Sequence, residues 1–170
     1  MPSTYTLIKG ETLASSAASY TFTAIPSTFT DLVVRTSTRG TSGGWNSVIL
    51  TLNNNNSSVY SVTWLQGDGS SATSNRQSSQ TTMQLDRNTI PSQDTNLFNN
   101  TEYYIPNYLS TVAKPVSNFG VGDRNTTEAY IAAMAGLANI TSAITSIKIE
   151  NNTSNFVSGS SFYLYGISKS

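Results

Sequence analysis

The sequence contains neither cysteine nor histidine, and these two absences exclude several kinds of chemistry. Without cysteine, the chain forms no disulfide and carries no thiol nucleophile. Without histidine, it lacks the commonest general base and metal ligand, so Ser-His and Cys-His catalytic pairs and the usual zinc sites are excluded. We therefore expect no cofactor, and we expect the fold to be stabilised by a sheet core and by partner subunits.

Charged residues are also few, at 11% of the chain, which is less than half of the usual share. Nine basic and nine acidic residues balance, and the basic residues are scattered, which argues against a nucleic-acid partner. No apolar run has the length of a membrane span. Residues 1–5 lack the basic and apolar regions of a signal peptide, so the sequence predicts a product of the cytoplasm with no membrane partner.

Serine, threonine and asparagine are abundant, at about 40% of the chain. Disordered chains are also polar, but they are poor in aromatic residues, whereas this chain has 10% aromatic residues, including nine tyrosines. Outward-facing polar residues on strands explain both features. The 170 residues suit one folded domain, with residues 1–16 as an N-terminal arm that reaches a neighbour.

Alternation of apolar residues with serine or threonine recurs along the chain and predicts strands. It covers residues 4–8, 18–24, 31–36, 47–52, 60–65, 102–106, 115–121, 143–150 and 162–167, with a short strand at 81–85. Turns are expected at 25–28, 40–44 and 53–56, a long polar loop at 67–80 and a second loop at 86–93.

The alanine-rich segment 128–137 has the propensity of a helix, but it contains a glycine and is flanked by strands. We interpret it as a strand whose small side chains allow close packing. The chain thus has about eight to ten strands and no helix with convincing caps. This pattern predicts a single-domain, all-β antiparallel sandwich, specifically a jelly roll.

The acidic residues lie mostly in loops and at strand ends, and none forms a recognisable acid–base pair. The two loops that come nearest to a calcium site, 67–70 and 122–125, hold one acidic residue each, which is ordinary turn chemistry. The sequence therefore predicts neither a catalytic residue nor a metal site, and it does not indicate an enzyme.

Carbohydrate binding remains an alternative, because exposed aromatic rings beside amides and hydroxyls hold sugars. Trp45 and Asn46 lie in a glycine-rich loop, where Trp45 either contacts a ligand or anchors the loop. Tyr103, Tyr104 and Tyr108 flank a proline, and these tyrosines serve either binding or ordinary sheet packing. A second tryptophan, at position 64, lies in an alternating strand and is expected in the core.

A family resemblance rests on four sequence segments: AIPSTFTDLVV at 24–34, LNNNNSSVY at 52–60, YIPNY at 104–108 and FYLYGI at 162–167. Together they resemble small virion structural proteins of tailed bacteriophages, which are capsid decoration proteins or tail-fibre and appendage modules. The resemblance implies a virion location and a homotrimer in contact with the major capsid protein or with tail proteins. It implies a capsid decoration protein first, and alternatively a tail-fibre module that binds a host glycan through Trp45 and the loop at 67–80.

Overall fold

The computed structural model describes residues 4–41, 46–88, 97–123 and 129–168, and within them the chain folds as strands in two antiparallel sheets. The described residues contain twelve strands and no helix. The strands are β1 (Tyr5–Thr12), β2 (Ser19–Phe22), β3 (Asp31–Thr38), β4 (Asn46–Leu52), β5 (Tyr60–Gly67), β6 (Ala72–Gln80), β7 (Met83–Asn88), β8 (Asn99–Ile105), β9 (Lys114–Asp123), β10 (Ala129–Ala138), β11 (Ile147–Asn151) and β12 (Ser161–Ile167).

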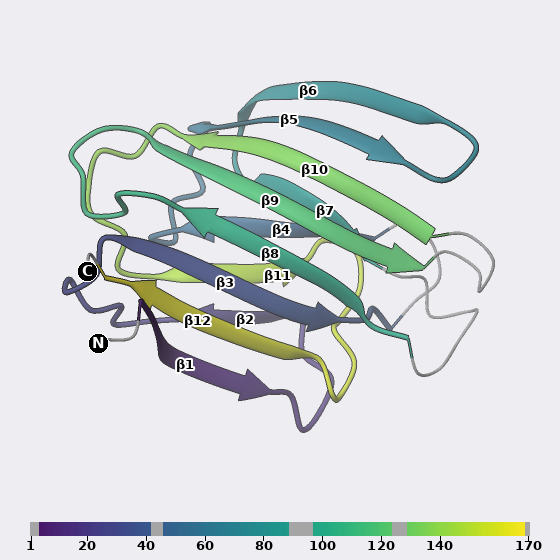
Figure 1. Ribbon diagram of the computed structural model, residues 1–170, viewed down its shortest axis with the longest axis horizontal. Coiled ribbons are helices and arrows are strands. Elements are labelled where there is room, and N and C mark those ends of the chain that lie inside the picture. The colour runs from purple at the N-terminus through teal and green to yellow at the C-terminus, as the bar shows by residue number, and fades with distance from the viewer. Residues whose placement is uncertain (1–3, 42–45, 89–96, 124–128, 169–170) are drawn as a thin grey trace.

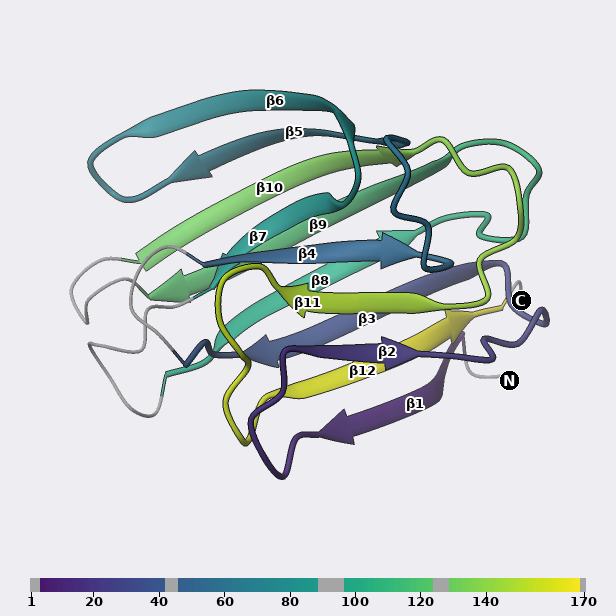
Figure 2. The ribbon, with the colours of Figure 1, turned by 180° about the vertical axis from the view of Figure 1, so that it is seen from behind.

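Eight of the strands form a jelly roll, which confirms the expected fold class. Strand β1 pairs with β12, β2 with β11, β3 with β8, and β4 with β7. The chain is therefore wrapped as a long hairpin, and the order β1-β12-β3-β8 in one sheet faces β2-β11-β4-β7 in the other. The two layers are seen from opposite sides in Figures 1 and 2.

Two further hairpins, β5–β6 and β9–β10, are inserted into this chain path and extend only one of the sheets. They continue it beyond β8 in the order β9-β10-β5-β6, so the larger sheet has eight strands and the smaller sheet has four. Figure 1 shows this extension as a broad continuous layer, with β6 at its outer edge. The inserted hairpins are not needed to close the jelly roll, and they nearly double the width of one face.

The core lies between the two sheets and is filled by alternate residues of each strand. It contains aliphatic and aromatic side chains from both layers, such as Leu32, Leu50, Phe162 and Ile147, each with an exposed fraction of zero. The inserted hairpins join this core as well. On β10, Tyr130, Ala132, Met134, Gly136 and Ala138 face inward, and β7 of the smaller sheet packs against them.

The buried Lys114, at the start of β9, holds the adjacent loops together. Its ammonium Nζ donates hydrogen bonds to the carbonyl oxygens of Ser110, Val112 and Ile140, at 2.7, 2.6 and 3.0 Å. Burial lowers the pKa of this lysine, because the charged form loses hydration. The three carbonyl oxygens compensate for that lost hydration, so the lysine acts as a structural clamp.

The polar segment 67–80, which we expected to be a long loop, is a tight turn followed by the nine-residue strand β6. This prediction was wrong because β6 is an edge strand that pairs only with β5 and is exposed along most of its length. A strand without a buried face needs no apolar alternation. The described residues also hold more strands than the eight to ten we expected, and β2 and β11 are shorter than their predicted segments.

Other expectations are confirmed. The alanine-rich segment is strand β10, and Trp64 packs, partly buried, against the core. The asparagine run begins with a turn in which Asn53 and Asn54 both have a left-handed φ of 53°, a conformation that asparagine tolerates. The N-terminal arm is not among the confirmed expectations, because Tyr5–Thr12 is strand β1 and pairs with β12 of the same chain.

Candidate functional site

The predicted binding tyrosines, whose side chains the structure describes, do not gather into one site. Trp45 lies outside the described residues, and Asn46 begins β4, where its backbone is paired with Asn88. Tyr103 and Tyr108 are core residues with exposed fractions of zero. The Tyr108 hydroxyl donates to the carbonyl of Pro26, and burial raises its pKa. Sheet packing, rather than ligand contact, is therefore their role in this fold.

Tyr104 is the one of the three tyrosines that faces outward. Its hydroxyl donates to Asp31 Oδ2 at 2.8 Å, and the other oxygen of Asp31 accepts the backbone N–H of Asn107 at the same distance. This hydrogen bond to the carboxylate raises the pKa of Tyr104, because ionisation would place two negative charges together. Tyr104 thus belongs to the outer face of the eight-stranded sheet, the face turned away from the core.

That outer face is ordered in rows, because directly paired residues of neighbouring strands share a face. One row crosses all eight strands: Gly10, Tyr163, Arg35, Glu102, Phe119, Ala133, Leu65 and Ser74. A second row runs beside it: Leu7, Tyr165, Val33, Tyr104, Ser117, Ala135, Thr63 and Arg76. The composition of these rows changes between β8 and β9, which divides the face into two halves.

The tyrosine half lies over β1, β12, β3 and β8, and its aromatic residues are Tyr5, Tyr163, Tyr165 and Tyr104. Tyr5 is 46% exposed, and its ring meets that of Tyr165 edge to face, with 6.4 Å between centroids. The ring of Tyr163 lies against Gly10, where a Cβ atom would come within 2.9 Å of it. Because Gly10 has no side chain, the tyrosine can lie across the edge strand.

Arg35 is the central cation of the tyrosine half. Its guanidinium carbon Cζ lies 5.9 Å from the ring centroid of Tyr5 and 5.8 Å from that of Tyr165, within the range of cation–π attraction. Its Nε donates to Glu102 Oε2 at 2.8 Å, and this hydrogen bond raises the pKa of Arg35. The arginine is therefore held in one orientation, although half of its side chain is exposed.

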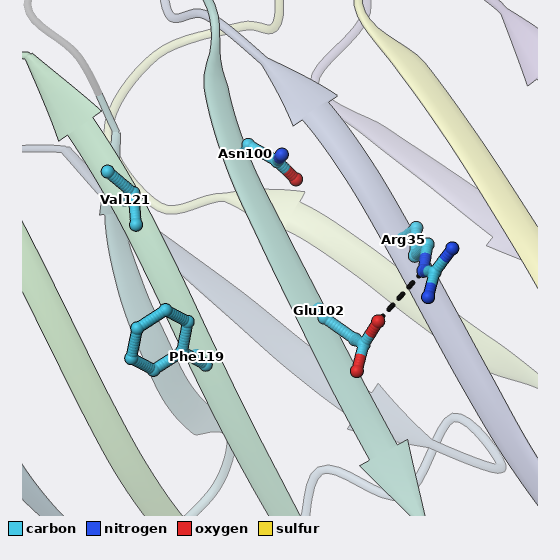
Figure 3. A pocket seen from close by; sticks show the side chains of 5 residues that line it. All are labelled: Arg35, Asn100, Glu102, Phe119 and Val121. Carbon is cyan, nitrogen blue, oxygen red and sulfur yellow. Dashed lines mark hydrogen bonds and ion pairs between the residues drawn. The ribbon is translucent and has the colours of Figure 1, made fainter.

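A hollow of about 370 Å³ lies at the border between the two halves. It is lined by Arg35, Asn100, Glu102, Phe119 and Val121, which Figure 3 shows on three adjacent strands with Glu102 turned toward Arg35. Its size is at the lower end of small-molecule sites. The hollow combines an ion pair and an amide with an exposed aromatic ring, so it can bind a neutral, partly apolar ligand.

The apolar half lies over the inserted strands β9, β10, β5 and β6. Its large side chains are all exposed to about one half: Leu65 57%, Phe119 53%, Ile131 47%, Val121 45% and Leu137 44%. A shallow second hollow of about 200 Å³ lies among them, lined by Leu65, Gln66, Gly67, Ala72, Ile131 and Ala133. Lone exposed apolar residues are common on proteins, but a contiguous group marks a contact surface.

Sequence reasoning singled out neither half, although β10 carried a signal for the apolar one. Its ten residues, AYIAAMAGLA, include no charged or amide side chain and no serine or threonine. An antiparallel strand with one solvated face normally alternates apolar with polar residues, and a continuous apolar run indicates a strand covered on both faces. Here one face of β10 is buried and the other is exposed.

Within the described residues, no group of three or more acidic side chains is placed to hold a metal ion. The same part of the chain includes no helix that is long and apolar enough to cross a membrane. Comparison of the chain with models of protein families, with curated proteins and with solved structures found no match.

Proposed function

We propose that this protein is a structural component of a tailed bacteriophage particle, most directly a capsid decoration protein that binds the assembled head. The proposal starts from the four sequence segments, at 24–34, 52–60, 104–108 and 162–167, that resemble such proteins. It is supported by the tyrosine half of the outer face. Tyrosine and arginine are enriched in protein interfaces, and this surface carries four tyrosines around Arg35. Its carboxylates Glu102 and Asp31 are hydrogen-bonded to Arg35 and Tyr104.

The tyrosine half is also preorganised for binding. Arg35 is fixed between two rings and Glu102, so little side-chain freedom remains to be lost on association. A protein that binds only the assembled shell stabilises it by mass action. The function requires no catalysis, and its effect would be a head that resists heat or loss of DNA better than a bare head.

Gold-labelled antibodies against this protein, imaged on purified phage particles, test the proposal. We expect label over the head, and we expect heads that lack the protein to release DNA at a lower temperature. Tyr5→Ser should reduce the occupancy of heads, whereas Val112→Ser, at a 64% exposed loop position, should not. Label restricted to the tail, or no label on any particle, would contradict the decoration role.

One observation favours the second candidate, a tail-fibre or appendage module that binds a host glycan. The hollow at the border offers the ring of Phe119 as a platform and the polar groups of Asn100 and Glu102 beside it. Under this alternative, Asn100→Ala and Glu102→Gln would abolish binding to host cells without lowering the melting temperature. Trp45, predicted from the sequence, would be tested in the same assay, and label on the tail would favour this candidate.

A further inference from the structure

We infer that a second copy of this chain covers the apolar half of the outer face. The two copies pack face to face about a two-fold axis, and Phe119 of each copy enters the hollow between β10, β5 and β6 of the other. Four observations support the inference. They are the exposed apolar area, the apolar sequence of β10, the fit between the projecting ring of Phe119 (the knob) and the hollow, and the small number of charged side chains on this face. It does not depend on the virion role.

The exposed apolar area is large enough to form the centre of an interface. A buried phenylalanine contributes roughly 150–250 Å², so the five half-exposed side chains of the apolar half together leave on the order of 400–500 Å² in water. The exposed alanines of β10 enlarge the patch further. The largest patch on a typical monomer measures about 300–600 Å², and a stable interface buries about 800 Å² on each partner. The apolar half can therefore form the centre of a stable dimer.

Strand β10 indicates that this face is covered in the working assembly. Its outward residues Ile131, Ala133, Ala135 and Leu137 are as apolar as its inward ones. The inward residues are apolar because they pack in the core. The outward residues are equally apolar but exposed, so we expect a second apolar layer to cover them. Two sheets pack face to face about 10 Å apart through interlocking side chains, and a second copy of the same sheet supplies such a layer.

The apolar half contains both a knob and a matching hollow. Phe119 projects from β9 with 53% of its surface exposed, and its row neighbours toward β5 are the small Ala133 and then Leu65. The hollow floored by Gly67, Ala72 and Ala133 measures about 200 Å³. A cavity of about 150 Å³ already admits a benzene ring, so this hollow can receive the ring of a phenylalanine.

The position of knob and hollow selects the symmetry. Both lie on one sheet face and open in the same direction, so a copy that places its knob in the hollow presents its own hollow to the opposite knob. This reciprocal arrangement is an isologous contact, which closes after two copies. A cyclic trimer needs knob and hollow on different sides of the subunit. The geometry therefore favours a dimer over the trimer that the family resemblance implies.

Charge favours a second copy over an unrelated protein. Among the residues whose side chains are described, the outward face of β9, β10 and β5 carries no charged side chain; Arg76 lies on the edge strand β6, and Arg35 and Glu102 pair at the opposite border. Interfaces between identical subunits are more apolar than other interfaces. The chain has a formal net charge of zero, so two copies approach without long-range repulsion.

Sedimentation analysis of the purified full-length chain tests the inference. Over a range of micromolar concentrations we expect a mass of twice 18.2 kDa. Phe119→Ser, which removes the knob, and Ala133→Glu, which places a charge in the hollow, should each halve that mass. Circular dichroism should show an unchanged β-sheet spectrum for both, and Val112→Ser serves as an exposed apolar control that stays dimeric.

Cross-linking adds a test of the contact itself, because the chain has no cysteine of its own. Under mild oxidation, the double variant Phe119→Cys, Ala72→Cys should form a covalent dimer, while each single variant should cross-link far less. A wild-type chain that sediments as a monomer or a trimer would overturn the inference. So would a dimer that persists in both Phe119→Ser and Ala133→Glu. Neither result would affect the labelling of phage heads.

Discussion

Replacing Gly136 with alanine should weaken the contact between the inserted hairpins and the smaller sheet. Gly136 lies on the inward face of β10, and the side chain of Met83, fully buried on β7, rests against it. An added Cβ would lie 2.3 Å from Met83 Sδ, 3.0 Å from its Cε and 3.1 Å from its Cγ. Non-bonded heavy atoms pack at about 3.5–4.0 Å, so the methionine must move by more than about 1 Å.

The expected loss follows from two opposing effects. Inserting a methyl group into a packed core costs about 1–3 kcal/mol. Replacing a glycine with alanine also lowers the conformational entropy of the unfolded chain, which raises the free energy of unfolding by about 0.4–1 kcal/mol. We therefore expect Gly136→Ala to lower the free energy of unfolding by about 1–2 kcal/mol. Urea denaturation followed by tryptophan fluorescence would measure it, with an unchanged m-value showing that the compactness of the two states is preserved.

A double-mutant cycle with Met83→Ala tests the physical reason for the loss. Met83→Ala alone should cost about 2–5 kcal/mol, because it leaves a cavity. In the double variant the new methyl group occupies part of that cavity, so the combined loss should be smaller than the sum by about 1 kcal/mol or more. Additive losses, or a Gly136→Ala variant as stable as the wild type, would refute the argument.

Three further predictions concern single polar groups. Lys114→Met should lower the free energy of unfolding in urea by about 3 kcal/mol or more, because three backbone carbonyls, buried or partly buried, lose their donor. A loss below about 1 kcal/mol would contradict the clamp. Tyr60→Phe should cost about 1–3 kcal/mol, because the hydroxyl accepts the buried N–H of Leu52 at 3.0 Å; wild-type stability would show that this bond contributes nothing. Hydrogen bonds from the backbone and side chains of Ser71 and Ser70 lower the pKa of Asp68 to about 2. Its stabilising effect is thus present above the usual aspartate pKa and disappears as the pH falls through about 2, and a carboxyl titration by NMR with a midpoint near 4 would disprove it.

The fold could be predicted from the sequence wherever a strand has one buried and one solvated face. Strands β5 and β12 show that alternation, and the sequence places them nearly as the structure does. Edge strand β6 could not be found in this way, because a backbone ladder to β5 holds it and its side chains bury little. Strand β10 showed no polar alternation either, and the glycine within it, Gly136, supported the correct interpretation.

The candidate site was harder to predict from the sequence than the fold was. Proximity to a proline suggested Tyr103, Tyr104 and Tyr108 as a group, yet alternation sends Tyr103 inward and Tyr104 outward. Arg35 and Glu102 are 67 residues apart, and only the pairing of β3 with β8 brings them together. Rows across a sheet depend on strand order and register, and neither can be read from local patterns.

The two inserted hairpins connect the stability of the subunit with its assembly. Their inner side is anchored to the core through Gly136 and Met83, and their outer side carries Phe119 and the apolar hollow. A core variant that shifts β10 should therefore weaken both folding and dimerisation, because the hollow is built on the same strand. An outer-face variant such as Phe119→Ser should weaken dimerisation and leave the folding of the subunit intact. This asymmetry separates interface effects from core effects in one set of variants.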